Sequence, residues 1–251
     1  MTDFNRFGTV PILLAVLFLN GCATYYLPNS HNVPLLSEKN DARVSLTGTD
    51  YRKSNSLFTL EFQGSYAVSN KIGVVVNTMV GGIGGGSEFK YLDVGGGYFR
   101  ANKSGFIFES YGGVGFGNAR TGSATLLGSF GWHNDANFMK YYVQPSFGYK
   151  TNVLELAISW RLAALDFTSI SGSGISSANA EELAAIQMIQ SNPASFLSEP
   201  AVTARLGFKV FKIQAQWGWV QQPESSKLPT GTRVSEPWTV LQYRWNQEGI
   251  V

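Results

Sequence analysis

The chain has 251 residues and a formal net charge of +2 at neutral pH, too small a basic excess to indicate a nucleic-acid-binding surface. Charged residues make up only 14% of the sequence, against roughly a quarter in typical soluble domains, while aromatic residues make up 14% and glycines number 28. This composition excludes a disordered chain, which needs low hydrophobicity and high charge, and favours a β-protein with one face against an apolar environment.

An apolar run near the N-terminus, residues 12–19, is followed closely by Gly21 and Cys22. The run is too short to span a bilayer as a helix, which takes roughly 20 residues, and it suits the core of a secretory signal with Arg6 upstream. The layout resembles the signal of a bacterial lipoprotein, so we expect residues 1–21 to be cleaved and Cys22 to carry a covalent lipid. An ordinary secretory signal with a chance cysteine is the alternative. Because the chain has no second cysteine, it can form no intrachain disulfide.

The next part of the chain, residues 22–41, is predicted to be a periplasmic linker. Pro28, Pro34 and the polar cluster at residues 29–32 would interrupt any regular element. After the linker, apolar and polar residues alternate with a period of two, which indicates strands with one apolar face. The clearest example, residues 58–68, predicts a strand about 35 Å long, whereas strands of globular proteins average five or six residues. Strands that cross a bilayer need about nine to eleven.

The alternation recurs often enough to predict ten strands. They cover residues 43–48, 58–68, 72–80, 92–98, 106–116, 139–149, 154–162, 202–210, 213–219 and 241–245. Tight turns and long loops alternate between them, which is typical of an outer-membrane barrel. We therefore predict an all-β fold for residues 42–251: an antiparallel transmembrane β-barrel with short periplasmic turns and long outer loops, of ten strands or of eight. A soluble lipocalin-like barrel or a sandwich is the alternative, with its apolar faces inside.

An apolar face toward lipid would send the charged side chains of these strands into the interior. They are Arg43, Glu61, Asp93, Glu109, Lys140, Glu155, Arg161, Arg205, Lys209 and Arg244. A barrel of this size is narrow, and charges in a dry interior are costly unless they pair. We predict a plugged interior held by an ion-pair network, with a narrow pore for small polar solutes as the alternative.

One helix is predicted, over residues 179–190, in the longest outer loop. Asn179 is a good N-cap, Glu182 can bond back to it, and Pro193 ends the helix. Its apolar stripe consists of Leu183, Ile186 and Ile189. This stripe either packs over the barrel mouth or forms a docking face for a partner protein.

Signals for catalysis are weak. Outer-membrane acyl hydrolases of barrel type pair a serine with a histidine, and only Ser129 and His133, with Asp135 nearby, could form such a pair. The glycine run at residues 81–86 lacks the following Lys-Ser or Lys-Thr of a phosphate-binding loop and is interpreted as a loop tip. No Cys/His cluster has metal-ligand spacing. We predict no enzymatic activity, no nucleic-acid partner and no cofactor other than the lipid on Cys22.

Three segments carry a resemblance to a known family: YYLPNSHNVPLLSEK (residues 25–39), QPSFGYK (144–150) and EPAVTARLGFK (199–209). They resemble lipid-anchored outer-membrane β-barrels of diderm bacteria, most of which have no assigned activity. The likeness covers most of the mature chain and transfers no catalytic residue. It implies a place in the outer membrane, with membrane lipid and other outer-membrane or periplasmic proteins as partners.

Two further expectations concern the anchor and the function. Some diderm lineages export lipoproteins to the surface through acidic residues directly after the cysteine, and residues 23–26 contain none. An even number of strands also places both termini at the short-turn side, so we expect the lipid in the periplasmic leaflet. The predicted function is that of a non-catalytic structural or accessory subunit of a larger outer-membrane complex. A narrow pore and a lipid-modifying hydrolase are the alternatives.

Overall fold

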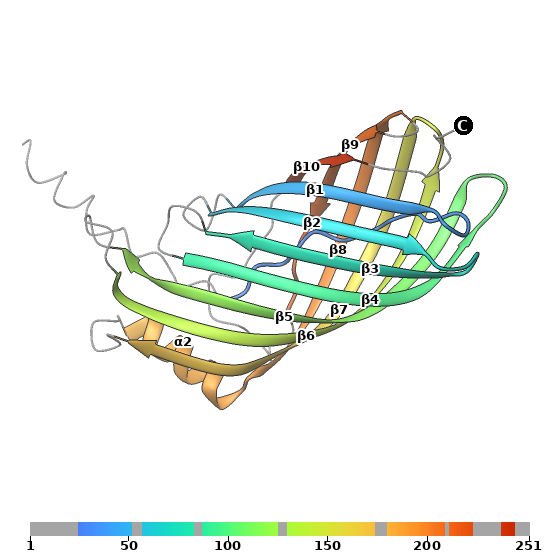
Figure 1. Ribbon diagram of the computed structural model, residues 1–251. Helices are drawn as coiled ribbons and strands as arrows, with labels where there is room; N and C mark the ends of the chain where they lie inside the picture. Colours follow the sequence, from blue (N-terminus) through green and yellow to red (C-terminus); the bar gives the residue numbers. More distant parts are fainter. Residues whose placement is uncertain are drawn as a thin grey trace, which may run out of the picture.

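The computed structural model describes residues 25–51, 57–82, 87–124, 130–173, 180–208, 211–222 and 237–243. Ten strands form one sheet in which each strand pairs with its neighbours in the chain (Figure 1). The strands are β1 (Ala42–Tyr51), β2 (Leu57–Ala67), β3 (Ile72–Gly81), β4 (Ser87–Ala101), β5 (Phe106–Ala124), β6 (Phe130–Lys150), β7 (Leu154–Ser173), β8 (Ala194–Gly207), β9 (Phe211–Gly218) and β10 (Pro237–Tyr243). All pairings are antiparallel, so the predicted all-β, antiparallel organisation is confirmed.

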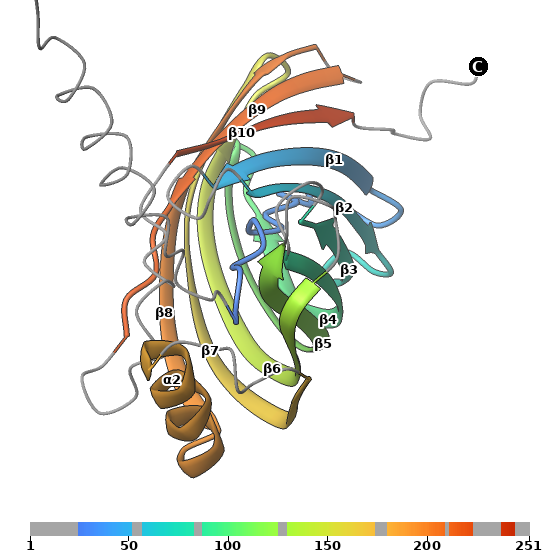
Figure 2. The same cartoon turned by 90° about the vertical axis from the view of Figure 1, so that its left-hand side faces the viewer.

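The sheet is strongly curled, and its first and last strands, β1 and β10, lie beside each other (Figure 1). We call the concave side of this curl the interior. Figure 2 shows that the segment preceding β1 lies within the curl.

The connections differ between the two ends of the sheet. At one end, which we call the short-turn end, only residues 68–71, 102–105, 151–153 and 208–210 separate consecutive strands. The turn after β4 is typical: the Asn102 side chain accepts hydrogen bonds from the Ser104 and Phe106 amides, both at 2.9 Å. Gly105 there has a φ of 89°, a value that favours glycine. The opposite end carries the longer connections and is called the long-loop end.

Three strands rise well beyond the others at the long-loop end. β5, β6 and β7 have 19, 21 and 20 residues, and Figure 1 shows their ends extending past those of β1 to β4 on the left. Residues 118–137, expected to be an outer loop, are therefore largely strand. Within this extension the Arg120 guanidinium donates to Asp135 at 2.8 Å across β5 and β6.

The predicted helix is confirmed to within one residue as α2 (Ala180–Ser191). Ile186 and Ile189 are buried in one apolar cluster with Leu165, Phe167 and Leu197 of β7 and β8. The stripe therefore packs against its own sheet. Within the described residues, no helix is both long and apolar enough to cross a bilayer.

Exposure alternates along each strand, with the apolar residues on the outside. On β7 the outward Ile158, Trp160 and Leu162 are 60%, 55% and 49% exposed, whereas Ser159 and Arg161 between them are buried. Apolar side chains such as Phe89, Phe99 and Phe138 are also buried, in clusters toward the two ends of the interior. Between these clusters, most outward positions of β2 to β9 carry large apolar side chains and most inward positions carry polar ones. This is the reverse of a soluble barrel or sandwich, whose apolar side chains fill the interior.

Candidate functional site: the occupied interior

The most unusual part of the molecule is residues 25–36, which we call the N-terminal segment. It has no regular secondary structure, yet every one of its residues is buried. Figure 2 shows it inside the curl of the sheet. The sequence predicts a linker over residues 22–41, and the irregular backbone agrees with that, but the burial does not. A buried backbone without a ladder partner needs hydrogen bonds from elsewhere, and here interior side chains provide them.

Arginines of the interior bind the carbonyl groups near the middle of the segment. Arg43 of β1 donates to the Val33 and Pro34 carbonyls at 3.1 and 2.8 Å. Arg205 of β8 reaches the same Val33 carbonyl at 2.7 Å from the other side. The guanidinium group suits this role because it offers several donors in a fixed plane.

Arg161 of β7 binds the segment about four residues earlier in the chain, at Asn29 and Ser30. Its terminal nitrogens donate to the Asn29 carbonyl at 3.2 Å, to the Asn29 side-chain oxygen at 3.0 Å and to the Ser30 carbonyl at 3.3 Å. Its Nε donates to Gln144 of β6 at 3.0 Å. One side chain therefore fixes two peptide units and is itself oriented by a neighbouring strand.

Carboxylates and amides accept the N–H groups of the segment. The Ser30 amide donates to Glu61 at 2.8 Å, and the Ser30 hydroxyl donates to the same carboxylate oxygen. The Leu35 amide donates to Glu109 at 3.0 Å. Gln216 of β9 pairs with both backbone groups of His31, accepting from its N–H at 2.8 Å and donating to its carbonyl at 3.1 Å. The interior thus binds the backbone of an irregular peptide segment through side-chain hydrogen bonds.

The side chains of the segment are recognised as well. Asn32 donates to Asn77 of β3 at 2.8 Å, and His31 Nδ1 lies 2.7 Å from the Ser159 hydroxyl. Leu35 sits over Gly148, where an added Cβ would come within 2.5 Å of a Leu35 methyl carbon. The glycine therefore provides the room that this leucine occupies.

Two ion-pair groups lie in the interior, and in each of them one carboxylate faces several cations. Glu155 lies 3.4 Å from Arg43, 3.1 Å from Arg205 and 3.8 Å from Lys212. The second group is centred on Glu199.

Lys140 and Arg161 each lie 3.3 Å from Glu199, and the Tyr26 hydroxyl donates to it at 2.7 Å. Taking ions out of water costs several kcal/mol each, so the buried cations depend on these two carboxylates and on the carbonyl and hydroxyl oxygens around them.

The structure places most of the predicted interior residues on the inner face. Those that it describes, all buried, are Arg43, Glu61, Asp93, Glu109, Lys140, Glu155, Arg161 and Arg205. Asp93 accepts from Asn77 at 2.6 Å and from Tyr142 at 3.1 Å. Lys209, Arg244 and the lipidation candidate Cys22 lie outside the described residues.

Other predicted positions are less closely linked to this site. In α2, Leu183 is half-buried, and Ile186 and Ile189 are in contact with the sheet, as the packing alternative expects. A partner docking on this stripe stays a prediction. Ser129 lies outside the described residues. His133 Nε2 is 3.8 Å from Asp135, whose other oxygen accepts from Arg120.

Sequence reasoning missed Glu199 and the polar residues of the N-terminal segment. Glu199 could have been found by extending the alternation of β8 backwards from Arg205 through Thr203 and Ala201, because these residues share the inner face. For the segment, no periodic pattern exists that would indicate burial.

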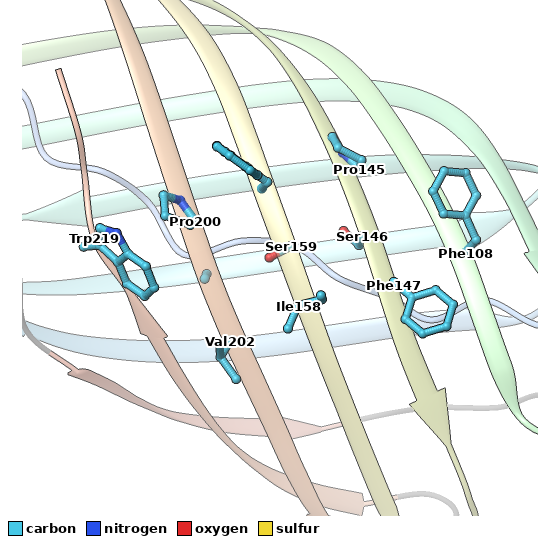
Figure 3. Close-up of a pocket in the computed structure, with 11 residues that line it drawn as sticks. Phe108, Pro145, Ser146, Phe147, Ile158, Ser159, Pro200, Val202 and Trp219 are labelled. Carbon is cyan, nitrogen blue, oxygen red and sulfur yellow. The ribbon is translucent and has the colours of Figure 1, made fainter. Parts of the chain in front are cut away.

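A hollow of about 340 Å³ opens on the outward face of the sheet. Figure 3 shows its lining side chains, among them Phe108, Phe147, Ile158, Val202 and Trp219. Trp160 lies between two prolines of the neighbouring strands, Pro145 and Pro200. Beside Pro145 the ladder between β6 and β7 is interrupted, from the pair Val143–Leu162 to the pair Ser146–Ser159. The hollow thus coincides with a local loss of strand pairing, since proline has no N–H to donate.

No family model matches the chain, and no curated protein matches it either. Among the described residues, no group of His, Cys, Asp and Glu is arranged to hold a metal ion.

Proposed function

We propose that the curled sheet is a β-barrel embedded in a bacterial outer membrane, with its short-turn end in the periplasm and its long-loop end outside. The outward apolar side chains support this proposal, since they form a band of exposed residues around the described strands. Removing one such large side chain completely from water contributes about 1.5–3 kcal/mol. Contact of the whole band with acyl chains is therefore favourable by on the order of tens of kcal/mol. The proximity of β1 and β10 supports closure.

We further propose that the protein is a non-catalytic accessory or structural subunit of a larger outer-membrane complex, anchored also by a lipid on Cys22. The observation that carries this proposal is the occupied interior. Arg43, Arg161 and Arg205 bind the chain's own backbone, so the groups that would attract a solute are already engaged. A barrel with an occupied interior can act only through its outer surface and its loops. The long extensions of β5, β6 and β7 are one such surface.

Native mass spectrometry of mild detergent extracts tests the role as a subunit. The proposal predicts a defined complex that contains this protein and at least one other protein. Detection of the monomer alone would overturn it.

Planar-bilayer recording separates the closed barrel from a narrow pore. The purified protein should give no steady conductance, and a reproducible conductance step would favour the pore instead. For the hydrolase, His133→Ala is the decisive variant: a lipid-cleaving activity that this substitution abolished would replace the proposed non-catalytic role.

A further inference from the structure

The two ends of the N-terminal segment lie at opposite ends of the sheet. Its C-terminal end is at the short-turn end, where Leu36 packs with Ala67, Val75, Phe99 and Tyr111. The residues that follow are fixed there too: the Lys39 amide donates to Asn70 at 2.8 Å and the Asn40 amide donates to the Ala67 carbonyl at 2.9 Å. These contacts lead the chain directly into β1.

The N-terminal end of the segment lies toward the long loops. Tyr25, Tyr26 and Leu27 belong to the apolar cluster that also holds Phe89, Phe138, Phe167 and the two buried isoleucines of α2. Phe89 is the third residue of β4 after a long loop, and Phe167 lies on the part of β7 that extends toward the long-loop end.

Hydrogen bonds between the segment and β6 trace the path between these two ends. Along the strand they join Tyr25 to Asn134 (3.5 Å), Tyr26 to Lys140 (2.6 Å), Asn32 to Gln144 (2.8 Å) and Leu35 to Lys150 (2.9 Å). Because β6 begins at the long-loop end and ends at the short-turn end, the segment crosses the interior from one end to the other. Eleven extended peptide steps reach about 36–40 Å, enough to cross the roughly 30 Å hydrocarbon core of a bilayer.

We infer that the mature chain is threaded through its own barrel, so that the lipid on Cys22 enters the membrane leaflet at the long-loop end. This inference rests on the proposed membrane barrel. Residue 22 is three peptide steps from Tyr25, a reach of about 11 Å at most, whatever path the intervening residues take. The interior that leads back to the short-turn end is filled by the segment itself. The geometry therefore favours the leaflet opposite to the periplasmic one expected from the sequence.

Threading would also make the closure permanent. The segment is continuous with β1 at one end and with the anchored cysteine at the other, so it cannot leave the interior unless the acyl chains leave the bilayer. A tethered segment also stays at high effective concentration next to its binding groups.

Cysteine accessibility in intact cells tests the inference. The full-length protein would carry one added cysteine at a time: Thr24→Cys next to the anchor, Ser171→Cys at the exposed long-loop end of β7, or Lys103→Cys in a short turn. A membrane-impermeant maleimide is applied to intact cells, to permeabilised cells and to denatured protein, with the denatured signal as reference. We expect the cysteines at positions 24 and 171 to be labelled in intact cells, and the cysteine at position 103 only after permeabilisation.

The outcomes distinguish the inference from the function on which it rests. If the cysteine at position 24 follows the one at position 103, or reacts only in denatured protein, threading to the outer face is wrong while the barrel stands. If positions 103 and 171 behave alike, or in the reverse order, the proposed orientation of the barrel in the membrane fails.

Discussion

Replacing Arg161 by methionine would test how the interior holds the N-terminal segment. The substitution keeps an unbranched apolar stem but removes the guanidinium that binds Asn29, Ser30 and Gln144 and pairs with Glu199 at 3.3 Å. Removing one partner of a buried ion pair costs about 3–5 kcal/mol, because the remaining charge stays buried. The carbonyls of residues 29 and 30 would also lose donors.

The expected loss of about 3–5 kcal/mol corresponds to about two to four orders of magnitude in the equilibrium between the held and released segment. In protein that lacks the anchor through Cys22→Ser, it can be measured as the rate at which a protease added to vesicles cuts within residues 25–36, with the fragments identified by mass spectrometry. Urea unfolding in the same vesicles gives the global stability. Release of the segment alone would raise the cutting rate and leave the unfolding midpoint of the sheet nearly unchanged.

Arg100→Met is the matched control, because Arg100 is exposed on β4 and the substitution removes the same charge without leaving a buried partner. A double variant with Glu199→Gln adds a second check. The two substitutions together should cost less than the sum of their separate effects, since each removes the reason for the other's penalty. If Arg161→Met is as stable and as protease-resistant as Arg100→Met, the segment is not held by this interior network.

Three further predictions concern packing and the outward face. Gly148→Ala should loosen the segment at a cost of about 1–3 kcal/mol, because the new Cβ would meet Leu35. Gly96→Ala should be tolerated, because the nearest atom to its new Cβ is 3.7 Å away. Equal stabilities of the two variants in urea unfolding would contradict this. Leu35→Ala should lower the free energy of unfolding by about 2–5 kcal/mol, because it leaves a cavity in the interior. Leu206→Ala, on the outer face, should lower it clearly less in lipid vesicles. The reverse order would refute the assigned burial. A variant that keeps Trp160 as its only tryptophan should be strongly quenched by lipids brominated in mid-chain, and fluorescence insensitive to bromine would place Trp160 away from acyl chains.

The strands were predictable because their alternation is long and regular. Along β2 and along residues 154–162 of β7 the apolar residues follow one face without a break. This pattern fixes both the element and the side on which each residue lies. The tight turns are equally local, as Asn102 and Gly105 carry their own turn geometry. The ends of β5 and β6 were missed because their extensions are rich in glycine and polar residues, whose pairing depends on the neighbouring strand.

The burial of the N-terminal segment was not predictable from local pattern. Pro28 and Pro34 correctly indicate an irregular backbone, but an irregular polar stretch has the same composition in a solvated linker and in a filled interior. Its partners Arg43, Arg161 and Gln216 lie on strands that are distant in sequence. Only the curled arrangement of the sheet brings them to one peptide, so the sequence predicts the interior charges but not what they bind.

The central claim is that outward side chains of the sheet contact acyl chains while the inward ones are closed off from both lipid and water. Nitroxide labels placed one at a time along residues 154–163 of β7, in a Cys22→Ser background refolded into vesicles, test this directly. Labels at outward Leu156, Ile158 and Leu162 should collide freely with oxygen, which dissolves in lipid, and hardly with a water-soluble nickel complex. Labels at inward Ala157, Ser159 and Ala163 should be shielded from both reagents, giving a period of two along the strand. Outward labels that collide mainly with the nickel complex would contradict the membrane-facing arrangement, and inward labels open to it would contradict the occupied interior.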